Sequence, residues 1–488
     1  MTGLVFSYTD WQATLIPDIA THLGQEVLHI GRRTKPLAAP SVRSLRGFPV
    51  FEPDGDLPML RDAQGFEDRY LSDYVDQMTR YAPGIATRAH RLERFYEYRD
   101  HFHLTARKVL AYLQRNKVST VLYMNIPHMG DDYMFYRVAE WLGLPVIMLV
   151  TSLFRHRFFS TRSLEGFGLL QHHAVAPEKG IAERLDEELR SAVSIYMGGS
   201  YRMREGTRST AQTLSALSIL LTKCPRLLRQ PLAFRQALGE VHRIRHSLGK
   251  YRRAKREIGA GRRAEIFLKW IGGLERDIDT LPERIVYLAM HYQPEMTSSP
   301  QGGRYVDQAL LIEELSARLP QGVTLVAKEN PLQAASNRGP EFIDRVSRCP
   351  NVIVAHPQMD TQALLAKSEM VATITGTVGW EAIKAGKPCL CFGYSWYRDC
   401  TGVTQFTPQT DVARAMTEYP DPHSTDAFLS SLIARAHDGV IYEAFFKDQS
   451  TAYAAENQAA IPKLFADLMS GSVAPTFDAV TDMTGHSA

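Results

Sequence analysis

One stretch of the chain combines glycines, threonines and a glutamate in a pattern suited to binding a phosphate. It begins at Thr373 and reads Thr-Ile-Thr-Gly-Thr-Val-Gly-Trp-Glu-Ala-Ile-Lys-Ala-Gly-Lys-Pro. We predict that a strand ends at Ile374 and that Gly376 and Gly379 open the turn into a helix, because they have no Cβ to block a close approach. The first N–H groups and the dipole of such a helix attract an anion, such as a diphosphate or a phosphate diester.

Three further side chains of this stretch can contribute to binding. Thr375 and Thr377 can donate hydroxyl hydrogen bonds to the anion. Glu381 lies about one turn inside the predicted helix, where its carboxylate can accept two hydrogen bonds from a ribose diol. The alternative is an ordinary strand–turn–helix joint. We favour a binding site, because three other polar or aromatic stretches lie at the ends of predicted strands.

The first of these stretches follows the first predicted strand of the same half. It places His291, Gln293 and Glu295 at alternate positions, so that they point one way from an extended loop. Ligands of open α/β sheets bind outside the carboxyl ends of strands. His291 can therefore meet a phosphate or act as an acid. The alternative is a capping loop with a histidine that is satisfied by its neighbours.

Two later stretches also end predicted strands. Lys328-Glu-Asn-Pro331 offers a lysine charge for a phosphate and a proline that fixes the turn, unless it is a surface Lys–Glu pair. Phe392-Gly-Tyr-Ser-Trp-Tyr397 carries aromatic rings that can stack on a base or a sugar, or fill the core.

The N-terminal half has one comparable stretch, Asn125–Tyr133, after a β-branched strand. His128, Asp131 or Asp132 can face a ligand there, and one of them can deprotonate an acceptor hydroxyl. One of the two aspartates is expected to be the N-cap of the helix that runs to Trp141. None of these residues has the spacing of metal ligands.

The elements that must position these residues alternate between strands and helices. Leu4–Ser7, a helix from Trp11 to Leu23 and Val27–Ile30 form a βαβ opening, which favours a parallel sheet. Gly24 can cap the helix, and a long helical region is predicted at about residues 61–116. From Arg284 onwards, five predicted strands alternate with four helices over about 110 residues, which fits one Rossmann-like domain. The predicted strands are Ile285–Met290, Val323–Lys328, Val352–Ala355, Met370–Ile374 and Pro388–Phe392, and the helices are Tyr305–Leu319, Pro340–Arg348, Thr361–Lys367 and Val378–Ala385. The fold class is therefore α/β.

Charge is unevenly spread along the 488 residues, although the formal net charge is only +3. Arg202–Arg263 contains 16 lysines and arginines against three acidic residues and has mostly helical spacing. Such a segment implies an anionic partner, which can be membrane lipid head groups, an acidic polymer or nucleic acid, unless it is only a solvated basic face. Of these partners, we expect peripheral contact with the anionic inner membrane. Nucleic acid is disfavoured, because stacking aromatics are not interleaved with the basic residues in a recognisable module.

Two features of the sequence indicate the cellular compartment of the protein. The N-terminus lacks the basic and apolar regions of a secretory signal, and no apolar run approaches about 18 residues. The five cysteines include one CxC pair, Cys389 and Cys391, and no second pair completes a zinc site. We therefore expect buried, reduced thiols in a cytoplasmic protein.

Together, the runs HYQPEMTSSPQGG, VAKENP, ITGTVGWEAIKAGKPCLCFG and WY resemble bacterial capsule and surface-polysaccharide biosynthesis proteins, which are related to capsular Kdo transferases. The resemblance is best over Arg284–Val403. It implies the GT-B fold, in which two Rossmann-like domains face a cleft, with the donor in the C-terminal half and the acceptor in the N-terminal half. It also implies that no metal or other cofactor is needed.

One position departs from that family. Relatives that use CMP-sugars commonly carry Lys-x-His-Pro, whereas here Asn330 stands in place of the histidine. Asn330 can donate a hydrogen bond but carries no charge. The donor class therefore stays open between a CMP-sugar such as CMP-Kdo and a UDP-sugar, for which Glu381 would hold the ribose.

The sequence thus predicts a metal-independent glycosyltransferase that acts on a capsular or surface polysaccharide or glycolipid. The alternatives are a non-catalytic assembly factor that binds a sugar or nucleotide, and a nucleotide-sugar epimerase or hydrolase on the same fold. We expect an acceptor domain at residues 1–177, a basic helical segment at 178–281, a nucleotide-sugar domain at 282–470 and a disordered tail at 471–488.

Overall fold

The computed structural model divides the chain into two compact units. One comprises Met1–Ser200, Pro294–Asp307 and Glu369–Ala488, and the other comprises Tyr201–Gln293 and Gln308–Ser368. The structure describes residues 2–31, 38–39, 41–46, 56–81, 92, 94–154, 156–170, 176–185, 262, 264–293, 295–333, 338–442 and 451–478. The predicted basic segment Arg202–Arg263 lies outside the described residues, apart from Arg262.

The first unit contains an eight-stranded sheet with the order β14-β7-β6-β5-β1-β2-β4-β3. Its central strands β6, β5, β1, β2 and β4 are parallel, and β7, β14 and β3 pair antiparallel at the two edges. The strands are β1 (Thr2–Ser7), β2 (Glu26–Gly31), β3 (Ala38–Ala39), β4 (Val42–Arg46), β5 (Val118–Tyr123), β6 (Val146–Thr151), β7 (Arg157–Thr161) and β14 (His437–Asp438). The parallel sheet predicted from the βαβ opening is confirmed.

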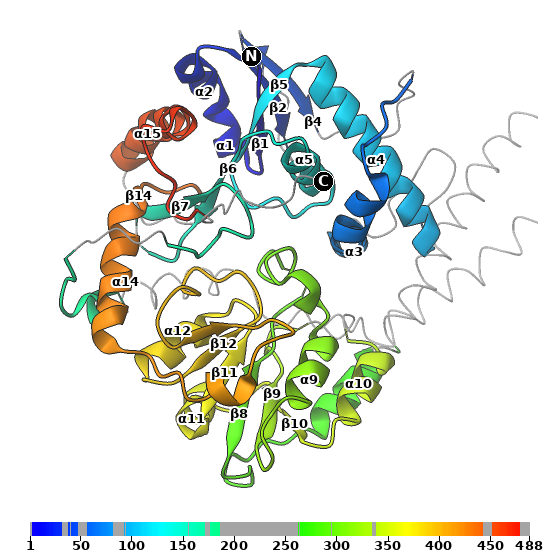
Figure 1. Ribbon diagram of the computed structural model, residues 1–488, viewed down its shortest axis with the longest axis vertical. Coiled ribbons are helices and arrows are strands. Elements are labelled where there is room, and N and C mark those ends of the chain that lie inside the picture. Colours follow the sequence, from blue (N-terminus) through cyan, green and yellow to red (C-terminus); the bar gives the residue numbers. More distant parts are fainter. Residues whose placement is uncertain are drawn as a thin grey trace, which may run out of the picture. The chain divides into compact units, whose positions relative to one another are not determined.

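Helices cover both faces of this sheet (Figure 1). The helices are α1 (Asp10–Thr14), α2 (Ile16–Leu23) and α15 (Thr451–Ser470) on one face, and α3 (Ala63–Tyr81), α4 (Phe95–Arg115) and α5 (Asp131–Trp141) on the other. Successive side chains of a strand point to opposite faces of the sheet, so each strand packs against the helices on both faces. Val5 and Leu122 lie in the cluster formed with α2 and α15, whereas the ring of Phe6 packs on Tyr123 and on Phe135 of α5.

The single helix predicted from Trp11 to Leu23 is two helices. Thr9 is the N-cap of α1 and accepts a hydrogen bond from the N–H of Gln12, and α1 ends at Thr14. A new helix then begins at Ile16 with Pro17 in its first turn, where the missing N–H of proline has no helical partner to lose. Gly24, in the left-handed conformation at φ 62°, ends α2 as predicted.

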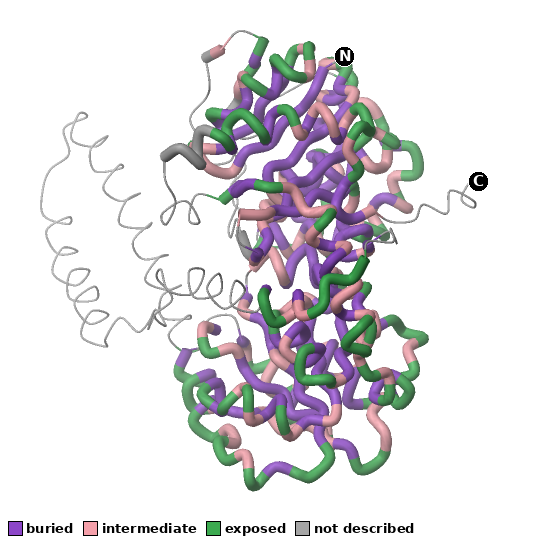
Figure 2. The backbone as a smooth tube through the Cα atoms, turned by 90° about the vertical axis from the view of Figure 1, so that its left-hand side faces the viewer, coloured by how far each residue is buried: buried purple, intermediate pink, exposed green. Residues whose placement is uncertain are grey.

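Six further strands have the order β10-β9-β8-β11-β12-β13. They are β8 (Ile285–Ala289), β9 (Thr324–Lys328), β10 (Val352–Ala355), β11 (Met370–Thr373), β12 (Cys389–Cys391) and β13 (Val403–Gln405). Strands β8, β9 and β10 of one unit pair in parallel, as do β11, β12 and β13 of the other. The five strands predicted from Arg284 onwards are therefore present, with β13 as an additional strand. Strands β8, β9, β11 and β12 are almost entirely buried, and Figure 2 shows such buried backbone in purple.

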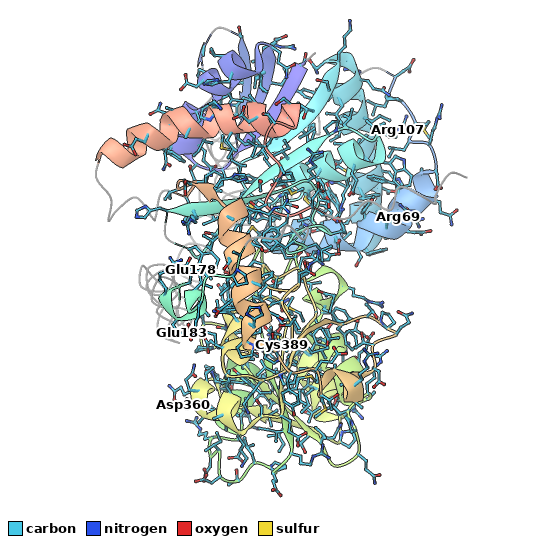
Figure 3. All side chains as sticks on the ribbon, turned by 60° about the vertical axis from the view of Figure 1, so that its left-hand side comes forward. Arg69, Arg107, Glu178, Glu183, Asp360 and Cys389 are labelled. Carbon is cyan, nitrogen blue, oxygen red and sulfur yellow. The ribbon has the colours of Figure 1, made fainter. Side chains whose placement is uncertain are left out.

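The helices in this part of the chain are η1 (Gly303–Val306), α9 (Gln308–Ser316), α10 (Pro340–Ser347), α11 (Thr361–Lys367), α12 (Thr377–Lys384), α13 (Val412–Ala415) and α14 (Pro422–Arg435). The helices predicted between these strands are present, except that the single helix predicted at Tyr305–Leu319 is the short 3-10 helix η1 followed by α9; α13 and α14 come after β13. The N-cap of α11 is Asp360, whose carboxylate accepts hydrogen bonds from Gln362 N at 2.7 Å and Ala363 N at 3.0 Å (Figure 3).

Residues 471–478, which were expected to be disordered, are instead ordered. Phe477 is fully buried, and its ring packs on those of Phe159 and Phe167 at centroid distances of 5.0 and 4.9 Å. Its N–H donates to the carbonyl of Ser160 at 3.0 Å. The prediction of disorder rested on the small polar residues around Phe477 and is wrong for residues 471–478. One buried aromatic ring is enough to hold a short segment in place.

The helical region predicted at residues 61–116 is the pair α3 and α4. Arg107 of α4 donates hydrogen bonds to the carbonyls of Leu57 and Pro58 at 2.7 and 3.2 Å, which ties the segment before α3 to α4 (Figure 3). In the part of the chain that the structure describes, every helix is too short or too polar to cross a bilayer.

Candidate functional site

The turn between β11 and α12 has the predicted form. β11 ends at Thr373, and Gly376 is the N-cap of α12 at φ −70° and ψ 153°. Because glycine has no side chain, the first turn of α12 receives no side-chain cap. Thr377 is exposed at the first helical position. The hydroxyl proton of Thr375 is already used within the protein, because it is donated to the carbonyl of Thr297 at 3.0 Å.

Gly379 has a different role from the one predicted. A Cβ at this position would lie 2.3 Å from the hydroxyl oxygen of Tyr397 and 2.9 Å from the sulfur of Cys389. The close approach that requires glycine is therefore made by the protein's own Tyr397, whose hydroxyl donates to the carbonyl of Gly376. Tyr397 thus fixes the turn from the inside, and its ring is core rather than a stacking surface.

Glu295 and Glu381 lie in the same unit as this turn. The carboxylate of Glu295 accepts a hydrogen bond from the Thr297 hydroxyl at 2.7 Å, and burial raises the pKa of Glu295. Thr297 therefore connects two predicted site residues, Glu295 and Thr375. Glu381 is half-buried on α12, one turn after the N-cap.

In the other unit, His291 and Gln293 follow β8. Both are buried, and burial lowers the pKa of His291 to about 4. The imidazole of His291 is therefore neutral near pH 7 and would meet a phosphate as a hydrogen-bonding group without charge. The side chain of Gln293 does not point to a ligand, because its oxygen accepts a hydrogen bond from Arg338 at 2.7 Å.

Lys328 and Asn330 end β9 in the same unit. The ammonium group of Lys328 donates to the hydroxyl of Thr361, the first residue of α11, at 3.0 Å, and burial lowers the pKa of Lys328. The side-chain oxygen of Asn330 accepts the N–H of Leu332 at 2.9 Å, so this amide holds the turn. Asn330 thus takes a structural position next to the buried lysine.

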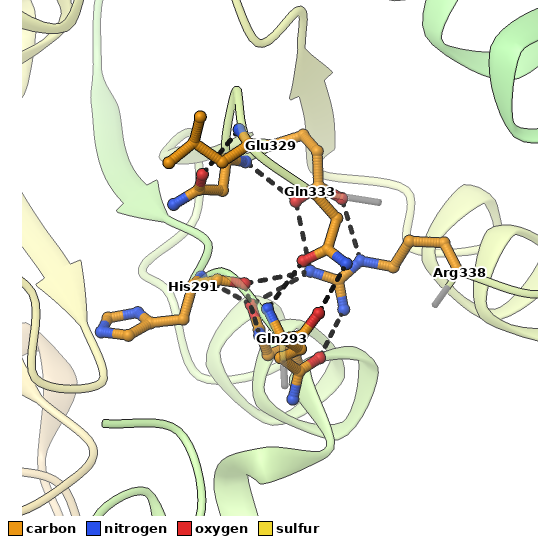
Figure 4. Close-up of polar contacts among 8 residues, drawn as sticks. His291, Gln293, Glu329, Gln333 and Arg338 are labelled. Atoms are coloured by element: carbon orange, nitrogen blue, oxygen red, sulfur yellow. Dashed lines mark hydrogen bonds and ion pairs between the residues drawn. The ribbon is translucent and has the colours of Figure 1, made fainter. Parts of the chain in front are cut away.

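Sequence reasoning missed four buried polar residues beside His291 and Gln293. They are Gln308, Glu329, Gln333 and Arg338 (Figure 4). Arg338 and Glu329 form an ion pair in which both side chains are almost completely buried. No spacing in the sequence connects these residues with His291 and Gln293, because Gln308 begins α9 and the other three lie in the loop between β9 and α10.

At the end of β5, the two aspartates are not helix caps. Gly130, at φ 92°, is the N-cap of α5, which begins at Asp131. The fully buried carboxylate of Asp132 turns back instead and accepts hydrogen bonds from the N–H groups of His128, Met129 and Tyr133 at 3.2, 2.7 and 2.7 Å. It also accepts one from the hydroxyl of Tyr8 at 2.8 Å.

His128 is held by these contacts and by its own ring. Its Nδ1 lies 2.6 Å from the carbonyl oxygen of Ile126, and its ring stacks on Tyr8 at 5.7 Å. Since a carbonyl only accepts, Nδ1 is the donor in this contact. Asp131 is half-buried and accepts the N–H of Asp132 at 3.0 Å. Among described residues, no group of three or more His, Cys, Asp or Glu side chains could hold a metal ion.

The family model for "Capsule polysaccharide biosynthesis protein" matches residues 297–440. The resemblance expected from the sequence is confirmed over this segment, which contains the turn between β11 and α12. No curated protein matches the chain.

Several solved structures are similar at low identity. KpsC of Thermosulfurimonas dismutans, a beta Kdo 2,7 transferase, is 11% identical over 92% of this chain and 98% of its own, with a TM-score of 0.32. The UDP-GlcNAc 2-epimerase of Methanocaldococcus jannaschii is 10% identical over 89% and 99%, with a TM-score of 0.23. WaaG, a glycosyltransferase involved in lipopolysaccharide biosynthesis, is 14% identical over 96% and 100%, with a TM-score of 0.21. Because these identities and TM-scores are low, the similar structures do not indicate the activity of this chain, and only its own residues can.

Proposed function

We propose that the protein is a glycosyltransferase that moves a sugar from a nucleotide-sugar to a capsular or surface polysaccharide or glycolipid. The observation that carries this proposal is the turn between β11 and α12. It lies inside the segment that matches the capsule polysaccharide family, and its glycine N-cap leaves the first turn of α12 without a side-chain cap. A helix start of this kind at the carboxyl end of a parallel strand suits a phosphate.

In this proposal, the C-terminal half binds the donor. The N-terminus of α12 and the ammonium group of Lys328 would stabilise the negative charge that develops on the leaving nucleotide, without a metal ion. Glu381 would accept hydrogen bonds from the ribose. His291 would contribute as a neutral hydrogen-bonding group, since its pKa of about 4 keeps it uncharged near neutral pH.

The N-terminal half would activate the acceptor. His128 is the best-placed base of the three predicted there, because its Nδ1 contact with Ile126 and its stacking on Tyr8 fix the orientation of its ring. Asp132 accepts four hydrogen bonds and is therefore best understood as the residue that fixes the His128 loop. Asp131 stays a second candidate base.

Transfer of labelled sugar by the purified protein tests the proposal. We expect Glu381→Ala and His291→Ala each to lower kcat/KM for the donor by about 10²-fold, because each removes a polar group from the donor site. Glu341→Gln, an exposed carboxylate on α10, is the matched control and should leave kcat/KM unchanged. Unchanged activity of both site variants would remove this assignment of the donor site.

The donor class can be determined by thermal shift with CMP, UDP, GDP and their sugars, because a ligand that binds only the folded state raises its stability. Binding without transfer to any acceptor would instead favour a non-catalytic assembly factor. Conversion of the donor without an acceptor would favour an epimerase or hydrolase.

Peripheral membrane contact through Arg202–Arg263 stays a prediction, and so does a cytoplasmic location. Vesicle pelleting at low and high salt tests the contact, since the attraction of basic residues to anionic lipids is screened by salt. Equal recovery in the supernatant with and without anionic lipid would contradict it.

A further inference from the structure

Six residues with buried polar side chains lie together around the loops that follow β8 and β9, and five of these side chains form a hydrogen-bonded network with the main chain of the sixth, His291 (Figure 4). Each is at most 7% exposed, and all belong to the same unit: His291, Gln293, Gln308, Glu329, Gln333 and Arg338. Buried polar groups are costly unless they are hydrogen-bonded, so a network of this size needs a structural or functional reason.

An ion pair lies at the centre of this network. Arg338 Nε and Nη2 donate to the two carboxylate oxygens of Glu329 at 2.9 and 3.2 Å, so the contact is bidentate. Arg338 Nη1 donates to the side-chain oxygen of Gln293 at 2.7 Å, and the guanidinium lies 4.5 Å from the ring centre of Phe342. Glu329 also accepts the N–H of Asn330 at 2.8 Å. The pair therefore holds the loop after β8 and the loop after β9 at once.

Two glutamine amides hold the backbone of the loop after β8 as a neighbouring strand would. Gln308 accepts the N–H of His291 at 2.9 Å and donates to its carbonyl at 3.0 Å. Gln333 does the same for Gln293, at 2.9 and 3.1 Å. Arg338 Nη2 also reaches the carbonyl of His291 at 3.5 Å and the side-chain oxygen of Gln308 at 3.4 Å. Residues 291–293 are thus fixed in their conformation by side chains.

The groups proposed to meet the donor lie at the border of this network. The imidazole of His291 projects away from the hydrogen-bonded cluster, while its main chain is held inside it (Figure 4). Lys328 is the residue directly before Glu329, and its carbonyl accepts the N–H of Met290 at 3.0 Å. A change in the pair would therefore move the backbone that carries both His291 and Lys328.

We propose that Arg338 and Glu329 are positioning residues that set the backbone of His291 and Lys328 for donor binding, an inference that rests on the proposed function. A buried ion pair contributes little net stability compared with apolar residues of similar size. What this pair provides is one fixed geometry for two loops, because a planar guanidinium and a carboxylate combine only in a narrow range of orientations.

The test compares two conservative variants with a matched control. Arg338→Lys keeps the charge but loses the bidentate geometry, and Glu329→Gln keeps the shape but loses the charge. The control is Arg345→Lys, which alters the bidentate pair of Arg345 with Glu313 at 2.8 and 2.6 Å. That pair joins α10 to α9 and involves neither loop.

For Arg338→Lys and Glu329→Gln, we expect at least a tenfold rise in the Kd of the nucleotide that the wild type binds, measured by calorimetry, and in KM for its sugar. The kcat at saturating donor should change less than threefold. Hydrogen exchange at the amides of residues 291–293 should become at least tenfold faster, with β8 itself unaffected. Arg345→Lys should keep Kd within twofold.

Two results would overturn the inference, and they are distinguishable. If the wild type binds a nucleotide and both variants keep its Kd within twofold, the pair is structural only and the inference alone falls. If the wild type binds none of CMP, UDP, GDP and their sugars, the proposed function falls and the inference falls with it.

Discussion

The carboxylate of Asp132 shows how a reactive residue type can be committed to structure. It accepts hydrogen bonds from three backbone N–H groups and from the Tyr8 hydroxyl, and these contacts hold the loop before α5. The side-chain oxygens of Gln293 and Asn330, which follow predicted strands, also accept hydrogen bonds from the protein itself. Gln293 accepts one from Arg338, and Asn330 accepts one from the N–H of Leu332.

Gly379 gives a prediction at the residue scale. An alanine would place its Cβ against Tyr397 and Cys389, so we expect Gly379→Ala to destabilise the protein by about 1–3 kcal/mol through overpacking. The thermal midpoint measures the effect. Gly272→Ala is the control, because nothing lies within 4 Å of its Cβ position and it should be neutral or slightly stabilising. Equal midpoints for the two variants would contradict the packing argument.

Elements far apart in sequence complete the first sheet. β14 pairs with β7, and α15 lies beside α2 on the sheet that the N-terminus begins (Figure 1). Asn457 of α15 joins this helix to the segment that follows β14, because its side-chain amide accepts the N–H of Val440 and donates to its carbonyl, both at 3.2 Å. The C-terminal segment is therefore part of the N-terminal core.

Phe477 tests the role of that segment. Phe477→Ala removes a fully buried ring from between Phe159 and Phe167, so we expect a loss of about 3–5 kcal/mol in the free energy of unfolding. Phe95→Ala, at a side chain that is 63% exposed, should change it by less than about 0.5 kcal/mol. Denaturant titration compares the two, and a small loss for Phe477→Ala would show that the segment contributes little.

Over the whole molecule, burial of histidines couples stability to pH. Burial lowers the pKa values of His29, His101, His291 and His437 from 6.5 to about 4. The folded state therefore holds these rings neutral, and the unfolded state takes up protons first. Their contribution to stability is complete above pH 6.5 and is lost as pH falls towards 4.

His29 offers a direct test of this pH dependence. It is fully buried between the hydroxyls of Ser7 and Ser44, each 2.8 Å from a ring nitrogen. Between pH 7.5 and 5.5, the wild type should lose about 1.4 kcal/mol more stability than His29→Asn, which cannot take up a proton. Denaturant midpoints at both pH values measure this. His423→Asn, at an exposed histidine, should behave like the wild type, and equal pH dependence in all three proteins would contradict the expectation.

The sequence by itself determined the order and type of most elements. Alternation of apolar residues and turn residues is local information, so the strands from β8 to β12 and the turn into α12 were found within one or two residues. It also pointed to the family that matches residues 297–440. Small patterns without apolar periodicity, such as β3 and β13, escaped it.

Only the tertiary structure decided which polar side chains are available for a ligand. Arg338 forms hydrogen bonds with Glu329, Gln293 and His291, which lie up to 47 residues away in the sequence, and no local spacing predicts these contacts. The same holds for Gly379, whose neighbour Tyr397 comes from another loop. The physical reason is that a hydrogen bond or a packing contact depends on three-dimensional proximity, whereas residue type specifies only which contacts are chemically allowed.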